Sequence, residues 1–242
     1  LLSWDRQGEF LNQERLPVPY WGPGFEVSRG ALLYVQGDES EESGEFIEVL
    51  TMSSGAEVLN LVSLRQEWVE VSSGCGNMPL PKPMTPSITW HANERYTVVA
   101  RWPDYVLQVF EGGVMIASLR REIPPTTITE DQVKVTIADG PLGFLVGSCR
   151  MTEAQVLHAA GFVDLVSPID RIIMDPLNRI WVRSKAMLGD SGRVDLLDTE
   201  NGYLGSASTP GFPVAFISEE RFLAVSNHDW GSSVDIWSIQ RE

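Results

Sequence analysis

The stretch DPLNRIWVRS, residues 175–184, joins a strongly marked turn directly to an alternating apolar segment. Asp, Pro and Asn favour the dihedral angles of tight turns, and the alternation after them has the two-residue period of a β-strand. We therefore expect Asp175–Asn178 to connect two antiparallel strands, with RIWVRS as the second. In that strand Ile180 and Val182 should face one neighbouring sheet and Trp181 the other.

The same order of turn and strand recurs in WHANERYTVVA (90–100) and ISEERFLAVS (217–226). Four-strand units that recur roughly every 40 residues are typical of β-propellers, whereas a β-sandwich would not repeat the same turn chemistry at the same place. We predict one all-β domain over residues 1–242, a β-propeller of four-stranded antiparallel blades. The last group has three strands and the first only a pair, and the groups span 1–16, 25–64, 87–120, 170–209 and 213–240.

The links between the predicted strands are of two kinds. Links from the first to the second strand, and from the third to the fourth, are tight. Links from the second to the third strand, and from one blade to the next, are longer and irregular. In a propeller the two kinds lie on opposite faces, and irregular loops on a rigid scaffold are the usual place for binding. The irregular face is therefore the predicted binding face.

Two segments depart from the strand pattern. Residues 65–86 end in NMPLPKPMTP and are predicted to be a proline-rich connector. Residues 121–167 are predicted to be a long insertion that carries one short helix. Thr152 and Gln155 form the capping box that begins this helix, and Gly161 ends it.

Composition narrows the classes of function. The chain has 242 residues, 43% of them apolar, which is enough for a core, and a formal net charge of −15. This charge repels a phosphate backbone, so nucleic-acid binding is disfavoured. No apolar run approaches the roughly 18 residues of a transmembrane helix. The chain begins Leu-Leu-Ser without a signal peptide, so we expect a mature product or a fragment.

Two cysteines, Cys75 and Cys149, lie far apart in the sequence and in Gly/Ser-rich surroundings. They form either a structural disulfide of an exported protein or two unrelated thiols. Their spacing matches no metal or redox motif, so the two alternatives stay open.

Two longer stretches carry a family resemblance: PIDRIIMDPLNRIWVRS with GRVDLLDTENGYLGS, and FPVAFISEERFLAVSNHD with VDIWSI. They resemble the C-terminal blades of bacterial six-bladed β-propellers of the NHL/TolB-like type, whose repeat contains D-x-x-G-R-[IL]-W-V. The resemblance covers residues 85–240 well and residues 1–65 loosely. Its motifs are architectural, so it implies a fold and says little about activity. It also implies a secreted, periplasmic or cell-surface location.

The number of blades is predicted to be five or six. At about 40–45 residues per blade, a six-bladed ring needs more chain than the groups found here. Either an N-terminal blade is missing, or the ring closes with five blades. In the second case LLSW and EFLNQ, near the start, would join the last group, whose outer strand is absent.

Aromatic residues on the irregular face are the main candidates for ligand contact. Tryptophans occur there in PYWGPG, RWPD and HDWG, where stacking and directional hydrogen bonds suit a glycan or a peptide. The alternative is that each tryptophan caps the core between blades. The loop SNHDWGSS (226–233) also holds adjacent His and Asp residues, which rarely face one another as acid–base chemistry requires. The predicted ligand-binding residues are Trp21, Trp102, Asp104, His228, Asp229 and Trp230.

No metal or cofactor site is predicted. The acidic run at residues 38–48 does not have the spacing of a calcium loop, and we expect a solvated loop there. The three histidines, His91, His158 and His228, are not at zinc-ligand spacing.

Two functions compete. The first is a non-catalytic propeller that binds a protein, peptide or glycan on its irregular face, or serves as a module of a larger envelope protein. The alternative is a metal-dependent hydrolase or lactonase resembling the gluconolactonase group, which needs Glu, Asn and Asp ligands from the inner strands of separate blades. The predicted inner strands supply only Glu26 and Asp170 as carboxylates. We therefore favour the binding protein over the enzyme.

Overall fold

The computed structural model describes residues 2–4, 9–13, 25–39, 46–54, 57–73, 76–139, 152–184, 193–209, 211–228 and 231–239. In this part of the chain β-strands predominate and the two helices are short. The strands pair with their neighbours in antiparallel fashion. The predicted all-β class with several antiparallel sheets is confirmed. Neither described helix is long and apolar enough to cross a membrane.

In the described part of the chain, four larger sheets follow one another, and within each the strands pair in sequence order. The prediction of recurrent four-strand units, the last with three strands, is confirmed. Sheet I comprises β3 (Phe25–Ser28), β4 (Ala31–Glu39), β5 (Phe46–Ser54) and β6 (Glu57–Gln66). Sheet II comprises β9 (Trp90–Ala92), β10 (Tyr96–Ala100), β11 (Val106–Glu111) and β12 (Val114–Arg120). Sheet III comprises β15 (Ile169–Met174), β16 (Ile180–Ser184), β17 (Arg193–Asp198) and β18 (Gly202–Ser208), and sheet IV comprises β19 (Pro213–Ser218), β20 (Arg221–His228) and β21 (Gly231–Ser238).

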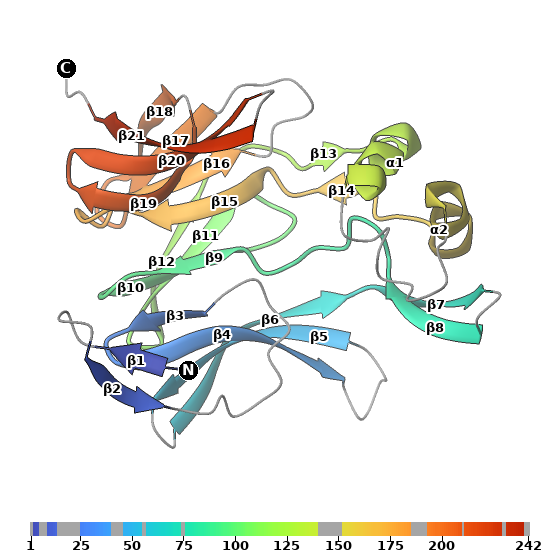
Figure 1. Ribbon diagram of the computed structural model, residues 1–242, viewed down its shortest axis with the longest axis horizontal. Helices are drawn as coiled ribbons and strands as arrows, with labels where there is room; N and C mark the ends of the chain where they lie inside the picture. The colour runs from blue at the N-terminus through green and yellow to red at the C-terminus, as the bar shows by residue number, and fades with distance from the viewer. Residues whose placement is uncertain are drawn as a thin grey trace.

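The sheets are layered in chain order, from sheet IV at the top of Figure 1 to sheet I at the bottom. Their first strands meet, because β9 contacts both β3 and β15, and β15 contacts β19. The alternating residues of the strands fill the spaces between the layers. Ile180 and Val182 pack toward sheet II with Leu107, whereas Trp181 packs toward sheet IV, 5.4 Å from the Phe216 ring centroid. The predicted orientation of these three residues is confirmed.

The turn before this strand is built around the side chain of Asp175, which is 1% exposed. One carboxylate oxygen, Oδ1, accepts hydrogen bonds from the backbone N–H groups of Leu177 and Arg179, each at 2.9 Å. The other, Oδ2, accepts from Arg179 Nε at 2.6 Å and from Trp181 Nε1 at 3.0 Å. Asn178 takes the left-handed conformation, with φ +62°. Because one carboxylate binds both the turn and the core tryptophan, the turn must directly precede the strand.

The predicted N-terminal pair is present as a hairpin of β1 (Leu2–Trp4) and β2 (Phe10–Gln13). This hairpin forms its own two-stranded sheet and does not pair with sheet IV. Among the described residues, β20 is the strand beside β21, and the sheets do not close a ring. The closure between the two termini that a five-bladed ring requires is therefore not seen.

A smaller lobe extends to one side of the layered sheets (Figure 1). Its hydrophobic core includes Val133, Ile137, Val156 and Leu157. The elements of this lobe are β7 (Trp68–Ser73), β8 (Gly76–Pro81), β13 (Thr126–Thr127), β14 (Leu165–Val166), α1 (Glu130–Asp139) and α2 (Glu153–Ala160).

The lobe confirms one prediction and corrects two. Helix α2 begins at the predicted capping box of Thr152 and Gln155 and ends at Gly161. The predicted connector over residues 65–86 is wrong in part, because it contains the paired strands β7 and β8. The described residues of the insertion form two helices instead of the single one expected, since α1 precedes α2.

Candidate functional site

The irregular face centres on Trp102, in the link between β10 and β11. The side chain is half-buried, and its peptide bond to Pro103 is cis. Trp102 borders three adjoining hollows of about 570, 320 and 350 Å³, which we call together the Trp102 groove. Lys82 and residues 84–87, in the connection from the lobe to sheet II, line parts of the same groove, as does Ser167, just before sheet III. The link within sheet II and the described links that precede sheets II and III therefore meet at this groove.

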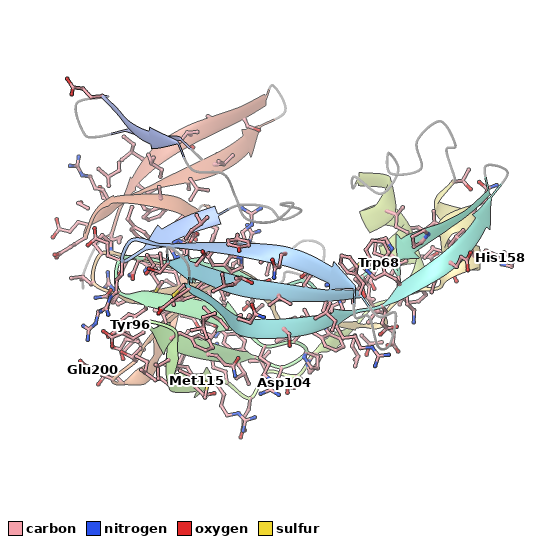
Figure 2. All side chains as sticks on the ribbon, turned by 90° about the horizontal axis from the view of Figure 1, so that it is seen from below. Trp68, Tyr96, Asp104, Met115, His158 and Glu200 are labelled. Carbon is pink, nitrogen blue, oxygen red and sulfur yellow. The ribbon has the colours of Figure 1, made fainter. Side chains whose placement is uncertain are left out.

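Two further aromatic rings form one end of the Trp102 groove. Phe46 begins β5 and Trp68 begins β7, and their ring centroids are 4.7 Å apart. Trp68 is 38% exposed. Figure 2 shows it where sheet I meets the lobe, with Asp104 at a lower edge and His158 at the far end of the lobe. The exposed part of the indole is a surface on which a flat or apolar ligand group can stack.

Small polar groups line another part of the groove. Hydroxyl groups and one carboxylate surround the hollow of about 320 Å³: Thr85, Ser87, Thr89, Ser167 and Asp170. Asp170 Oδ2 accepts a hydrogen bond from Arg183 Nε at 2.6 Å, so this carboxylate is held by an ion pair. Hydroxyl groups donate and accept hydrogen bonds, which suits the hydroxyl and amide groups of a ligand.

Hydrogen bonds, one buried and one partly buried, tie the groove to sheet I. Glu48 Oε2 accepts from the Ile88 backbone N–H at 2.9 Å, and Gln66 Nε2 donates to the carbonyl oxygen of Pro86. Burial raises the pKa of Glu48, and the hydrogen bonds from Ile88 and Gln66 act in the opposite direction. Residues 86–88 are therefore held in place, so this part of the groove is preformed. At the far side, Lys82 Nζ binds Glu67 Oε2 at 2.9 Å.

The predicted ligand-binding residues are only partly brought together. Trp102 lies in the groove, but Asp104 is exposed and does not line it. The predicted loop 226–233 is wrong in part, because residues 226–228 belong to β20 and pair with residues 231–233 of β21. Outside the described residues lie Trp21, Asp229 and Trp230, as do the two cysteines of the disulfide hypothesis, Cys75 and Cys149.

Sequence reasoning missed Phe46 because it lies in the predicted strand EFIEVLTM, and it missed Trp68 although this residue lies in the predicted connector over residues 65–86. The alternation in WVEVSS, residues 68–73, was the available signal for the strand that presents Trp68. It was hidden by the prolines that follow it.

The two carboxylates predicted to be innermost, Glu26 and Asp170, do line one hollow of about 530 Å³, together with His91. Within the described part of the chain, no three His, Cys, Asp or Glu side chains are grouped so that they could hold a metal ion. The ligand set of the hydrolase hypothesis is therefore not assembled by these residues.

Comparison with known proteins leaves the family open: no family model, curated protein or solved structure matches this chain. The resemblance to NHL/TolB-like propellers thus stays a prediction from turn and strand motifs.

Proposed function

We propose that this chain is a non-catalytic binding module of the β-propeller type, which engages an extended ligand through the Trp102 groove. The ligand is a peptide segment of a partner protein or an oligosaccharide. Support for the propeller comes from the four sequential sheets, whose first strands β3, β9, β15 and β19 make successive contacts. Binding clefts commonly form where loops of such a scaffold converge.

The observation that carries the proposal is the position of Trp102 at the junction of three hollows. An indole there can contact a ligand that occupies any of them. With Trp68 and Phe46 on one side and hydroxyl groups on the other, the groove offers stacking surfaces and hydrogen-bonding groups along one path. Such a combination suits a chain-like ligand with alternating apolar and polar groups.

The proposal is tested by probing peptide and glycan arrays with the labelled chain. We expect reproducible binding to one class, and a loss of about tenfold or more in affinity for Trp102→Ala and Trp68→Ala, because stacked aromatic residues dominate such contacts. Trp237→Ala is the matched control, since Trp237 is also half-buried but lies in β21 of sheet IV. The proposal fails if neither array binds the chain, or if binding survives both groove substitutions.

A further inference from the structure

The hollow of about 530 Å³ that Glu26, His91 and Asp170 line lies where the first strands of the four sheets come together. We call it the central hollow. Its titratable and charged lining residues are Glu26 from β3, His91 from β9, and Asp170 and Arg171 from β15. The residues contributed by β19 and the segment just before it are apolar. The hollow adjoins another of about 590 Å³ through shared residues, among them His91.

Strand β9 holds Glu26 and His91 in fixed positions. Glu26 Oε2 accepts a hydrogen bond from the Ala92 backbone N–H, and Glu26 Oε1 lies 3.9 Å from His91 Nε2. His91 Nδ1 accepts from the Met174 backbone N–H at 3.3 Å. The neutral imidazole therefore carries its proton on Nε2, the nitrogen that faces Glu26. Burial lowers the pKa of His91 to about 4, so the ring is uncharged at neutral pH.

Glu26 has no cationic partner among the described residues. Asp170 is paired with Arg183, and no hydrogen bond or ion pair joins Arg171 to Glu26. Burial raises the pKa of Glu26 to about 7, although the hydrogen bond from Ala92 favours the charged form. Glu26 is half-buried, and a bound cation would favour the ionised form of such a carboxylate.

The walls around Glu26 are polar in part, with the hydroxyl groups of Ser87 and Thr89, and apolar in part. Trp90 is half-buried on β9, and Ile173 and Val214 come from β15 and β19. A ligand that fits here combines one positive charge with an apolar body. The net charge of −15 adds a general attraction for cations.

We propose that this central hollow binds a small organic ammonium compound, with its cationic nitrogen on the Glu26 carboxylate and its hydrocarbon part against Trp90, Ile173 and Val214. The site adjoins the Trp102 groove, with which it shares Ser87, Thr89 and Asp170, but Glu26 lines only the central hollow. A Glu26 variant therefore tests this site apart from the groove. A divalent metal fits less well, because hard cations need several converging oxygen ligands, whereas Asp170 is held by Arg183 and His91 Nδ1 by Met174.

The test is titration calorimetry of the intact chain with benzylamine, benzyltrimethylammonium, neutral benzyl alcohol and calcium chloride. We expect both ammonium compounds to bind at millimolar concentration or below, and benzyl alcohol to bind at least about tenfold more weakly. Glu26→Gln should weaken ammonium binding about tenfold or more. Glu94→Gln is the matched control, because this exposed carboxyl lies at the adjoining hollow, and it should leave the affinity nearly unchanged.

The dependence of affinity on pH adds a readout that a merely structural role of Glu26 would not move. With a pKa of about 7, Glu26 is roughly one-tenth ionised at pH 6 and nine-tenths at pH 8, so benzyltrimethylammonium should bind about tenfold more weakly at pH 6. The proposal is overturned if benzyl alcohol binds as well as the cations, if neither cation binds, or if the folded Glu26→Gln variant retains the affinity. Stoichiometric calcium binding that this substitution abolishes would also overturn it, in favour of a metal site.

Discussion

Removal of the Asp175 carboxylate should destabilise the protein strongly, because four donors depend on it. Asp175→Ala leaves the buried Trp181 Nε1–H without its acceptor and deprives the Arg179 guanidinium of its ion pair. An orphaned buried donor costs about 1–3 kcal/mol, and a hydrogen bond to a charged group contributes about 1.5–3 kcal/mol. Because the Arg179 side chain is 22% exposed and water partly replaces its partner, we expect a total loss of about 3–5 kcal/mol.

Asp175→Asn distinguishes the hydrogen bonds that Oδ1 accepts from those that Oδ2 accepts. The amide oxygen can still accept from the Leu177 and Arg179 backbone N–H groups, as Oδ1 does now. The amide nitrogen then stands where Oδ2 accepts from Arg179 Nε and Trp181 Nε1, so donors face donors. We expect a loss of about 2–3 kcal/mol, smaller than for the alanine variant.

Urea unfolding followed by tryptophan fluorescence measures these free energies. Asp198→Ala is the matched control: Asp198 also accepts from turn N–H groups, those of Glu200 and Asn201, but the turn is exposed. It should cost about 1 kcal/mol or less. If Asp175→Ala loses no more stability than Asp198→Ala, the account of the DPLN turn as an anchor for sheet III is wrong.

Three further predictions concern stability. Asp195→Ala should lower the free energy of unfolding by about 3–5 kcal/mol, measured in the same urea assay, because it removes the buried partner of Arg121; a loss below about 1 kcal/mol would contradict this. Gly113→Ala should lower the melting temperature more than Gly112→Ala does. Both glycines have positive φ, but of the two only Gly113 would bring an added Cβ against a neighbouring side chain. Equal losses in melting temperature would refute the packing argument. The pKa of Glu26 is raised in the folded state, so ionisation of this group lowers the free energy of unfolding increasingly between about pH 4.5 and 7. Glu26→Gln should therefore stabilise the protein by about 1–3 kcal/mol more at pH 8 than at pH 4. Urea unfolding curves that give the same change in free energy for this substitution at both pH values would contradict the prediction.

Local patterns predicted the repeated sheets well. A turn followed by a two-residue alternation specifies a strand and its buried faces without long-range information, which is why the orientation of Trp181 could be foreseen. The same holds for α2, whose capping box is contained within four residues.

Helix α1 was missed although it has a similar signal. Gln132 Oε1 accepts from the Thr129 backbone N–H at 2.9 Å, as Gln155 Oε1 does from Thr152. The residues of α1 after this box, VKVTI, are mostly β-branched and favour a strand by propensity. Burial of Val133 and Ile137 in the core of the lobe overrides that preference. Pro79 and Pro81 hid the hairpin of β7 and β8 from the sequence analysis. In a two-stranded sheet each strand is an edge strand, and edge strands tolerate proline.

The candidate sites depended on contacts that the sequence pattern does not contain. Trp102 could be predicted because it stands in an irregular link, whereas its groove also requires Phe46 and Trp68 from two separate sheets. Glu26 lies in β3 and His91 in β9, far apart in the chain. The spacing of the histidines in the sequence gives no sign that these two residues are close together. Non-local geometry of this kind becomes visible only when the sheets are placed together.

The central claim, that binding takes place on the irregular face, is tested most directly by hydroxyl-radical footprinting of the chain with its strongest array ligand. Mass spectrometry reports the oxidation of each side chain with and without that ligand. We predict protection of Trp68 and Trp102, with unchanged oxidation of Pro176 and Leu177 on the tight-turn face. Protection of the turn residues together with unchanged oxidation of both tryptophans would contradict the claim.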